Sequence, residues 1–205
     1  MKGYDKVPRR LLSEQARAHL DTYPLDWPDL EYMIGGFYPG VGPREADYAS
    51  LSAIMLSTAS RGTVSISSAS IFDQPVIDVG IMTSTLDQDY AIAALRRLRE
   101  IFAAKALSPI VVGQEIVPGN GSRTDSQILN YIQDSARATC HVSCTCKMGK
   151  EGDPMAVVDS KGRVFGVNRL RVVDAAAMPL LPPGHPMATI YALAEKIAED
   201  VLSGR

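Results

Sequence analysis

The sequence predicts an α+β fold with a mainly antiparallel sheet and flanking helices. Apolar and small polar residues alternate over Arg61–Ser68 with the period of two that a half-buried strand shows. Apolar residues at helical spacing run through Leu86–Leu107, through Arg123–Thr139 and again after Pro186. No internal repeat or low-complexity tract interrupts this order, and 205 residues are enough to bury a real core.

The first part of the chain is expected to be irregular. Asp21–Glu45 carries several prolines and glycines among aromatic residues, which predicts a long loop packed through Trp27. Two strands follow, Tyr48–Thr58 and Arg61–Ser68. The short interval between them predicts an antiparallel pair that turns at Arg61-Gly62.

Two helices are expected in the middle of the chain. The first covers Leu86–Leu107, with Asp87 as its N-cap. The second covers Arg123–Thr139 and has Thr124 or Ser126 as its N-cap. Their apolar faces consist of Ile92, Leu95, Leu98 and Phe102 in the first helix and of Ile128, Leu129 and Ile132 in the second.

The last fifty residues predict two strand segments and a terminal helix. Ala156–Val167 is expected to form a strand–turn–strand with its turn at residues 160–162, and Asn168–Pro179 a further strand. The helix has Pro186 near its first turn and Gly204 after its last. Its buried stripe is expected to contain Ile190, Leu193, Ala194, Ile197 and Val201.

Composition and charge exclude several classes of protein. Hydrophobic residues make up 46% and charged residues 21% of the chain, as in ordinary globular domains. A net charge of −2 does not suit a nucleic-acid binder, which usually has a basic face. The first ten residues lack the apolar region of a signal peptide, and no apolar run approaches the ~20 residues of a membrane helix. We therefore expect a cytoplasmic protein with neither membrane nor nucleic acid as a partner.

All three cysteines lie with a histidine in the stretch ATCHVSCTCKMG (Ala138–Gly149). Structural zinc usually takes ligand pairs from two separate segments, and the spacing Cys-His-x-x-Cys-x-Cys matches no common zinc signature. A Cys144–His141 nucleophile is disfavoured because close sequence neighbours rarely present their side chains in productive geometry. We expect no metal, and cysteines that are small buried packing residues in a tight turn.

His141 and His185 are the candidate catalytic residues. Each lies between an irregular stretch and a regular element. His185 precedes the terminal helix, whose dipole favours negative charge and therefore a neutral imidazole. Two neutral imidazoles that face one cavity can remove a proton from a hydroxyl group and position its oxygen. His19, in a segment expected to be a surface helix, is interpreted as structural.

Three successive motifs resemble the C-terminal half of the glucose–methanol–choline (GMC) oxidoreductases: HVSCTCKMG, GRVFGVNRLRVVDAAAMP and GHPMATIYALAEKIAEDVL. That family shows His-x-x-Gly-Thr-x-x-Met-Gly, then a strand with Leu-Arg-Val-x-Asp-Ala that ends in Met-Pro, then a His-Pro, Asn-Pro or His-Thr pair. Ser60–Asp78 also resembles a strand of the family's substrate-binding domain, so the resemblance covers nearly the whole chain. Cys144 replaces the glycine of the first motif, a version that resembles members of fungal natural-product pathways.

The resemblance implies roles for individual residues. His141 would be the base for an alcohol, near the reactive edge of FAD, and His185 would be its partner, a histidine or asparagine in other members. Asp174 and Ala175 would contact the ribityl and pyrophosphate region of the flavin, and the backbone of Pro186 and Met187 would face the pyrimidine end of its ring system. Residues 1–155 would be the substrate-domain part of a single domain, and residues 156–205 a strand–helix segment that in the family returns to the FAD domain.

The family binds FAD through an N-terminal strand–Gly-x-Gly-x-x-Gly–helix unit, and the sequence contains none. Gly35–Gly42 has glycines but is expected to lack both a preceding buried strand and a following helix. Most contacts to FAD would then be missing from this chain, so no bound cofactor is expected unless an N-terminal half is supplied.

Three functional hypotheses follow for a chain of this kind. The first is a stand-alone enzyme in which the His pair performs acid–base conversion, such as cyclisation, dehydration or isomerisation, of a hydroxylated natural-product-like molecule. The second is FAD-dependent alcohol oxidation as the C-terminal half of a complete or split enzyme. The third is a non-catalytic remnant that binds a metabolite or a partner. Apolar residues exposed by the missing half, Ile190, Leu193 and Ile197, further predict a homodimer or a rearranged C-terminus.

Overall fold

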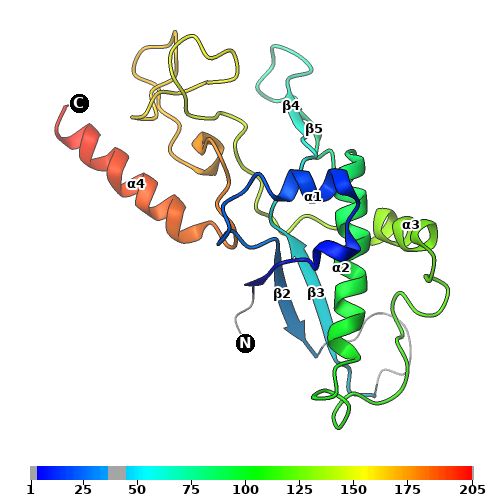
Figure 1. The fold of residues 1–205 in the computed structure, drawn as a ribbon. Coiled ribbons are helices and arrows are strands. Elements are labelled where there is room, and N and C mark those ends of the chain that lie inside the picture. Colours follow the sequence, from blue (N-terminus) through cyan, green and yellow to red (C-terminus); the bar gives the residue numbers. More distant parts are fainter. Residues whose placement is uncertain (1–3, 37–44, 205) are drawn as a thin grey trace. The chain divides into compact units, whose positions relative to one another are not determined.

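The computed structural model describes residues 4–36 and 45–204 and confirms the α+β class. Its contacts divide the chain into two compact units, each described here by itself. Unit 1 contains Met1–Gly62 and Val79–Arg137, and unit 2 contains Thr63–Asp78 and Ala138–Arg205. The elements of unit 1 are β1 (Tyr4–Asp5), η1 (Arg9–Leu11), α1 (Glu14–Leu20), β2 (Leu30–Gly35), β3 (Ser50–Met55), α2 (Thr85–Phe102) and α3 (Asp125–Ser135). Those of unit 2 are β4 (Thr63–Ser65), β5 (Val76–Asp78), η2 (Ala175–Ala177) and α4 (Met187–Leu202), and Figure 1 traces them along the chain.

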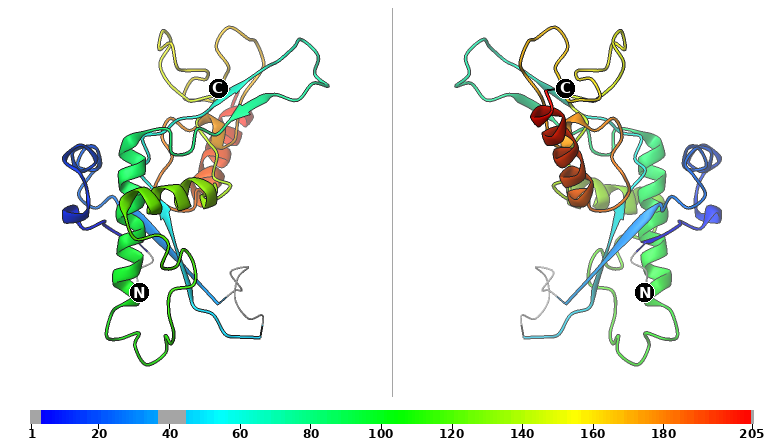
Figure 2. Two further views of the ribbon diagram at one scale, coloured as in Figure 1. Left: turned by 90° about the vertical axis from the view of Figure 1, so that its right-hand side faces the viewer. Right: turned by 90° about the vertical axis from the view of Figure 1, so that its left-hand side faces the viewer.

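Unit 1 is a helix-covered antiparallel sheet. Its strands are ordered β1-β2-β3, with Leu30 opposite Met55 and Gly35 opposite Ser50. Helix α2 lies along the sheet in contact with β3, while α1 and α3 pack against α2 (Figure 2). The main core is formed by Val7, Leu12, Ala16, Leu20, Leu30, Tyr90, Ala93 and Ala94, and a smaller core between α2 and α3 by Ala91, Ile128 and Ile132.

Unit 2 consists mostly of loops held by main-chain hydrogen bonds. Strands β4 and β5 pair antiparallel at the base of an arm. Helix α4 packs on the turn at residues 159–163, where the Ile197 side chain is buried and the Lys196 ammonium donates to the Ser160 carbonyl at 2.6 Å. The unit therefore has a small core, to which Val158 and Ala177 also contribute fully buried side chains.

The predicted strand pairing is wrong. β3 pairs with β2, which lies inside the segment expected to be a loop, and β4 pairs with β5 across the arm. Half-buried side chains on β2, such as Tyr32, gain more from the sheet and α2 than a loop would offer them. In the glycine stretch Gly35–Gly42, Gly35 ends β2, a strand that is buried only at Leu30 and Glu31, and residues 37–44 lie outside the described part of the chain.

The helices match the predictions better than the strands. Thr124 caps α3 in a full capping box with Gln127, as expected. Helix α4 begins directly after Pro186, and Gly204 follows its end. The cap of α2 is Ser84 rather than Asp87. Residues 156–179 contain only isolated bridges and η2, although residues 160–162 form the expected turn, in which the Gly162 amide donates to the Asp159 carbonyl at 2.9 Å.

The predicted apolar stripe of α4 is confirmed in part. Ile197 is buried and Leu193 half-buried within unit 2, whereas Val201 is exposed, contrary to expectation. The buried Ile197 removes part of the reason for expecting a homodimer, which stays a prediction, as does the division of the domain at residue 155. Among the helices of residues 4–36 and 45–204, none has the length and apolar character needed to cross a membrane.

Candidate functional site

The rings of His141 and His185 lie against each other in unit 2. Their centroids are 4.8 Å apart, and the ring planes meet at 81° in an edge-to-face arrangement. His141 is half-buried and His185 is exposed. The two histidines singled out from the sequence are therefore brought together, although their catalytic roles stay predictions.

A ladder of main-chain hydrogen bonds holds the loop that carries His141. The amides of Cys144, Cys146 and Met148 donate at 3.1, 2.9 and 2.9 Å to the successive carbonyls of η2, which are those of Ala175, Ala176 and Ala177. This ladder fixes the loop without using any of its side chains. Thr139, which the sequence did not single out, places its Oγ1 3.4 Å from the Nδ1 of His141. Its position two residues before the histidine is the signal that could have identified it.

His185 is positioned by the start of α4. It stands immediately before Pro186, the buried N-cap residue, which supplies no side-chain cap to the helix. The first-turn amides therefore have no side-chain acceptor at the cap, and the positive end of the helix dipole adjoins the His pair. The far part of α4 is anchored on the turn at residues 159–163, so the imidazole projects from a fixed element.

The four residues implied to contact flavin are also close to these elements. The Asp174 carboxylate is exposed and caps η2, accepting the Ala176 amide at 2.7 Å through Oδ1. Ala175 contributes its carbonyl to the ladder. Pro186 is buried at the start of α4, and Met187 is exposed in its first turn.

The cysteines differ from the expectation of buried packing residues. All three are free thiols; Cys140 is exposed, and Cys144 and Cys146 are half-buried. Cys140 and Cys144, with φ of 59° and 67°, lie in the left-handed region on either side of His141. The expected tight turn is present, but backbone conformation rather than side-chain burial forms it. Within the described residues, no group of three or more His, Cys, Asp or Glu side chains could hold a metal ion.

His19 has the structural role expected of it. It lies on α1, where its Nε2 is 3.1 Å from the Ser57 carbonyl and its ring packs edge-on against Tyr23. Both contacts are within unit 1. It therefore serves as a reference histidine outside the candidate site.

Comparison with known proteins decides the family. A family model described as GMC oxidoreductase matches residues 58–194, which include both histidines, the ladder and the first half of α4. The chain belongs to the GMC oxidoreductase family. The matched region is the C-terminal domain of the family, as the three motifs indicated.

The GMC relatives include enzymes of fungal natural-product biosynthesis. The chain is 46% identical over 211 residues to patulin synthase of Aspergillus clavatus, an alignment that covers 97% of this chain and 34% of the relative. It is 45% identical over 205 residues to versicolorin B synthase of Emericella nidulans, covering 98% of this chain and 32% of the relative. The chain thus spans about a third of the length of these curated relatives.

Solved GMC structures share the fold. Formate oxidase of Aspergillus oryzae superimposes with a TM-score of 0.84 at 22% identity, over 97% of this chain and 37% of that one. An FAD-dependent oxidoreductase from Chaetomium thermophilum superimposes with a TM-score of 0.68 at 34% identity, over 76% of this chain and 26% of that one. These matches confirm the α+β architecture of a GMC substrate-binding domain.

The residues of unit 2 fit part of an FAD site. The first-turn amides of α4, which no side chain caps, can donate to the carbonyl oxygens of a flavin pyrimidine ring. The exposed Asp174 carboxylate uses Oδ1 for its cap and leaves Oδ2 to accept from a ribityl hydroxyl. These groups would hold one end of FAD and cannot by themselves surround the whole cofactor.

Proposed function

We propose that His141 and His185 form an acid–base pair that acts on a hydroxyl group of a natural-product-like small molecule. The observation that supports this most directly is the 4.8 Å edge-to-face approach of the two rings. At this spacing one hydroxyl oxygen can lie within hydrogen-bond reach of a nitrogen from each ring. Acid–base catalysis by positioned groups accelerates reactions about 10²–10⁴-fold, which suffices for a reactive substrate.

In ring closure, the pair moves one proton and needs no redox partner. One imidazole takes the proton from a hydroxyl group, and that oxygen forms a C–O bond to a carbonyl carbon of the same molecule. The same imidazole then gives that proton to the carbonyl oxygen as its π bond breaks, while the neutral partner imidazole holds the reacting oxygen by a hydrogen bond. The product has the same atoms and electrons as the substrate, and both imidazoles return to their starting state.

The names of the relatives support a natural product as the substrate. Patulin synthase and versicolorin B synthase, at 46% and 45% identity, align with 97% and 98% of this chain. We therefore propose a hydroxylated natural product as the substrate class. A cyclisation, dehydration or isomerisation without flavin is the first reaction that we assign to it.

A second candidate is oxidation of an alcohol in the presence of FAD, which the FAD-dependent oxidoreductase at 34% identity favours. Here one imidazole would take the hydroxyl proton while the carbon loses hydride, and the other would orient the hydroxyl oxygen. FAD, when bound, supplies the acceptor for that hydride. Because the chain spans about a third of its curated relatives, this candidate requires an FAD-binding half, joined to these residues in one enzyme or supplied by a second chain.

One assay separates the candidates. 2-(Hydroxymethyl)acetophenone interconverts between an open hydroxyketone and a ring hemiketal, and NMR saturation transfer measures that rate. Benzyl alcohol reports oxidation through formation of benzaldehyde. We expect the unmodified chain to accelerate ring closure without flavin. The acceleration should be lost in His141→Gln and retained in the reference variant His19→Gln.

The other outcomes reject the first candidate. Oxidation would be favoured if benzaldehyde formed only after addition of FAD and the N-terminal two thirds of a relative, and if ring closure were not accelerated. If neither reaction exceeded that of buffer under either condition, and His141→Gln equalled the unmodified chain, both enzymatic candidates would be wrong and a binding role would remain.

A further inference from the structure

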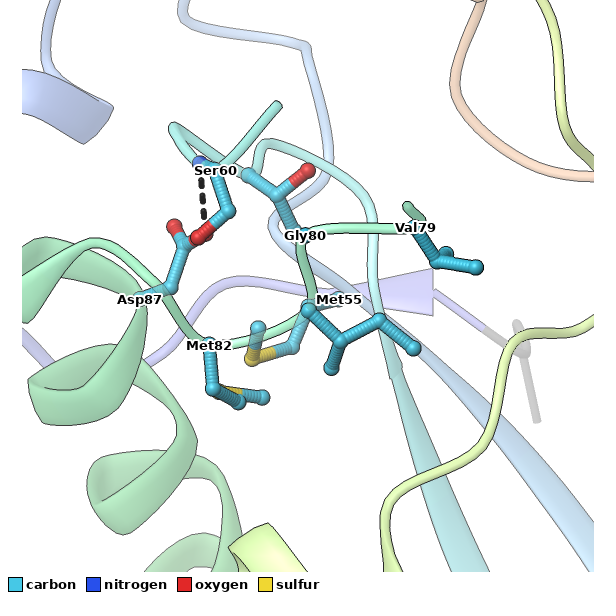
Figure 3. Close-up of a pocket in the computed structure, with 8 residues that line it drawn as sticks. Met55, Ser60, Val79, Gly80, Met82 and Asp87 are labelled. Atoms are coloured by element: carbon cyan, nitrogen blue, oxygen red, sulfur yellow. Dashed lines mark hydrogen bonds between the residues drawn. The ribbon is translucent and has the colours of Figure 1, made fainter. Parts of the chain in front are cut away.

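A cavity of about 200 Å³ opens in unit 1, outside the His site. It lies beyond the end of β3, beside the first turn of α2 and between two loops, residues 58–60 and 79–82. Its lining consists of Met55, Thr58, Ser60, Val79, Gly80, Ile81, Met82 and Asp87. Figure 3 shows Met55 and Met82 close together, with Gly80 between Val79 and the Ser60–Asp87 hydrogen bond.

The lining combines apolar side chains with two hydroxyl groups. Val79, Ile81 and the thioethers of Met55 and Met82 form the apolar part. Thioether side chains adapt to flat rings and make favourable contacts with them. The hydroxyl group of Thr58 has no hydrogen-bond partner in the described residues. That of Ser60 accepts the Ser84 amide at 3.0 Å and keeps its own proton to donate.

Charge restricts the ligand further. The Asp87 carboxylate is 1% exposed, and its two oxygens accept the amides of Ala59 and Ser60, each at 2.7 Å. These bonds hold a negative charge beside the cavity, which disfavours an anionic ligand. No lysine or arginine side chain lines the cavity to offset it.

Hydrogen bonds to α2 hold the two loops that form the walls of the cavity. Asp87 ties the loop at residues 58–60 to α2, and the Gln88 amide group donates to the Met82 carbonyl at 2.9 Å. Met82 is held at a φ of 59°, an uncommon conformation for a residue with a side chain. Such conformations persist where the surrounding structure over-determines them, and they cluster at ligand sites.

We propose that this cavity binds a compact neutral molecule or group, aromatic or branched aliphatic, that carries one hydroxyl or carbonyl oxygen. An engineered apolar cavity of about 150 Å³ takes up benzene, so about 200 Å³ accommodates a benzene ring with one small substituent. The ring lies against Met55 and Met82, and its oxygen meets the hydroxyl group of Thr58. This proposal does not depend on the proposed reaction of the His pair, and it is tested separately.

The test uses the full chain with ¹³C-labelled methionine methyl groups, titrated with phenol. A neighbouring hollow of about 370 Å³ shares Ile81 and Met82 with the cavity, so the Met55 methyl is the discriminating reporter. Met33 and Met155, both exposed and outside the lining, report nonspecific effects. We expect saturable shifts at Met55 and Met82 and none at the two reference methyl groups.

Three variants locate the ligand. Val79→Phe fills the cavity from an exposed position and should weaken phenol binding at least tenfold, while Val76→Phe, on the exposed strand β5, should leave it unchanged. Thr58→Val removes one hydroxyl group at nearly constant shape and should weaken phenol about two- to tenfold without affecting toluene.

The proposal is overturned by any of three results. The first is that the Met55 methyl shows no saturable shift up to the solubility of phenol. The second is that the reference methyl groups of Met33 and Met155 shift as much as that of Met55. The third is that phenol binds unchanged to a Val79→Phe variant whose circular dichroism spectrum matches that of the unmodified chain. Equal losses of phenol and toluene in Thr58→Val would reject the assignment of an oxygen-bearing ligand.

Discussion

The imidazole of His141 meets the imidazole of His185 edge to face, with their centroids 4.8 Å apart. One ring is carried by a loop bonded to η2 and the other by the residue before the cap of α4. Changes in the backbone at either of these elements should therefore alter the approach of the two rings.

Asp174 is predicted to position His141 through η2. Asp174→Ala removes the acceptor of the Ala176 amide and should lower the free energy of unfolding by about 1 kcal/mol, the usual effect of losing a cap. It should also shift the Cε1 proton resonance of His141, because the loop is bonded to η2. Asp174→Asn keeps an acceptor and should have a smaller effect on both readouts. Asp26→Ala, at an exposed aspartate in unit 1, is the control; an equal loss there would contradict the prediction.

Cys144 occupies a position that suits glycine. Its φ of 67° costs a residue with a side chain about 1–2 kcal/mol, partly offset in glycine by greater freedom of the unfolded chain. Urea denaturation of Cys144→Gly should therefore show unchanged stability or a gain of up to about 1 kcal/mol. Cys146→Gly, where φ is not left-handed, should lose stability. Similar losses in the two variants would contradict this account.

Alanine substitutions at Gly80 and Gly113 distinguish the cost of a steric clash from the cost of an unfavourable φ. Both have positive φ, 63° and 80°, but a Cβ at Gly80 would collide with the Arg61 carbonyl, whereas one at Gly113 meets nothing within 4 Å. Gly113→Ala should cost about 1 kcal/mol through φ alone. Gly80→Ala should cost at least about 2 kcal/mol more, because the Arg61 backbone must move. The two urea midpoints measure the difference, and equal midpoint shifts would reject it.

Asp159 links acidity to the stability of the turn beneath α4. Partial burial raises the pKa of its carboxyl group, but hydrogen bonds from the Arg163 amide and guanidinium and from the Lys161 amide outweigh burial and leave the pKa below its usual value. A lowered folded-state pKa gives stability that is present above the unfolded-state pKa of about 3.9 and is lost as pH falls through the folded-state pKa. Asp159→Asn should therefore be less stable at pH 6, and the difference should shrink below about pH 4. A constant difference from pH 6 to pH 2.5 would contradict this.

The helices could be predicted from local sequence signals. The strand pairing was predicted wrongly because it depends on contacts between residues distant in the sequence. The capping box of Thr124 and Gln127 is complete within four residues, so the start of α3 could be found from sequence. Strand β3 could pair with a neighbour before or after it, and the choice of β2 depends on burial against α2, which no short segment encodes. Asp87 was assigned as a cap because its position fits one, yet its carboxylate is taken by amides from a loop almost thirty residues away.

The site shows the same division. His141 and His185 were identified from their positions between irregular stretches and regular elements. Asp174 and Pro186 were identified because their motifs resemble the GMC family, and the family is confirmed. Thr139 and the ladder to η2 were missed, since main-chain hydrogen bonds leave little trace in side-chain identity. The left-handed backbone at Cys140 was hidden for a related reason, because glycine is the usual sign of that conformation.

The most direct test of the His pair is a double-mutant cycle on ring closure of 2-(hydroxymethyl)acetophenone, with His141→Gln, His185→Gln and the double variant. If the two imidazoles act as one unit, each single variant should lower kcat/KM about 10²–10⁴-fold and the double variant should fall little further. His19→Gln should match the unmodified chain. Losses that multiply in the double variant, or single variants as active as His19→Gln, would contradict a shared acid–base function.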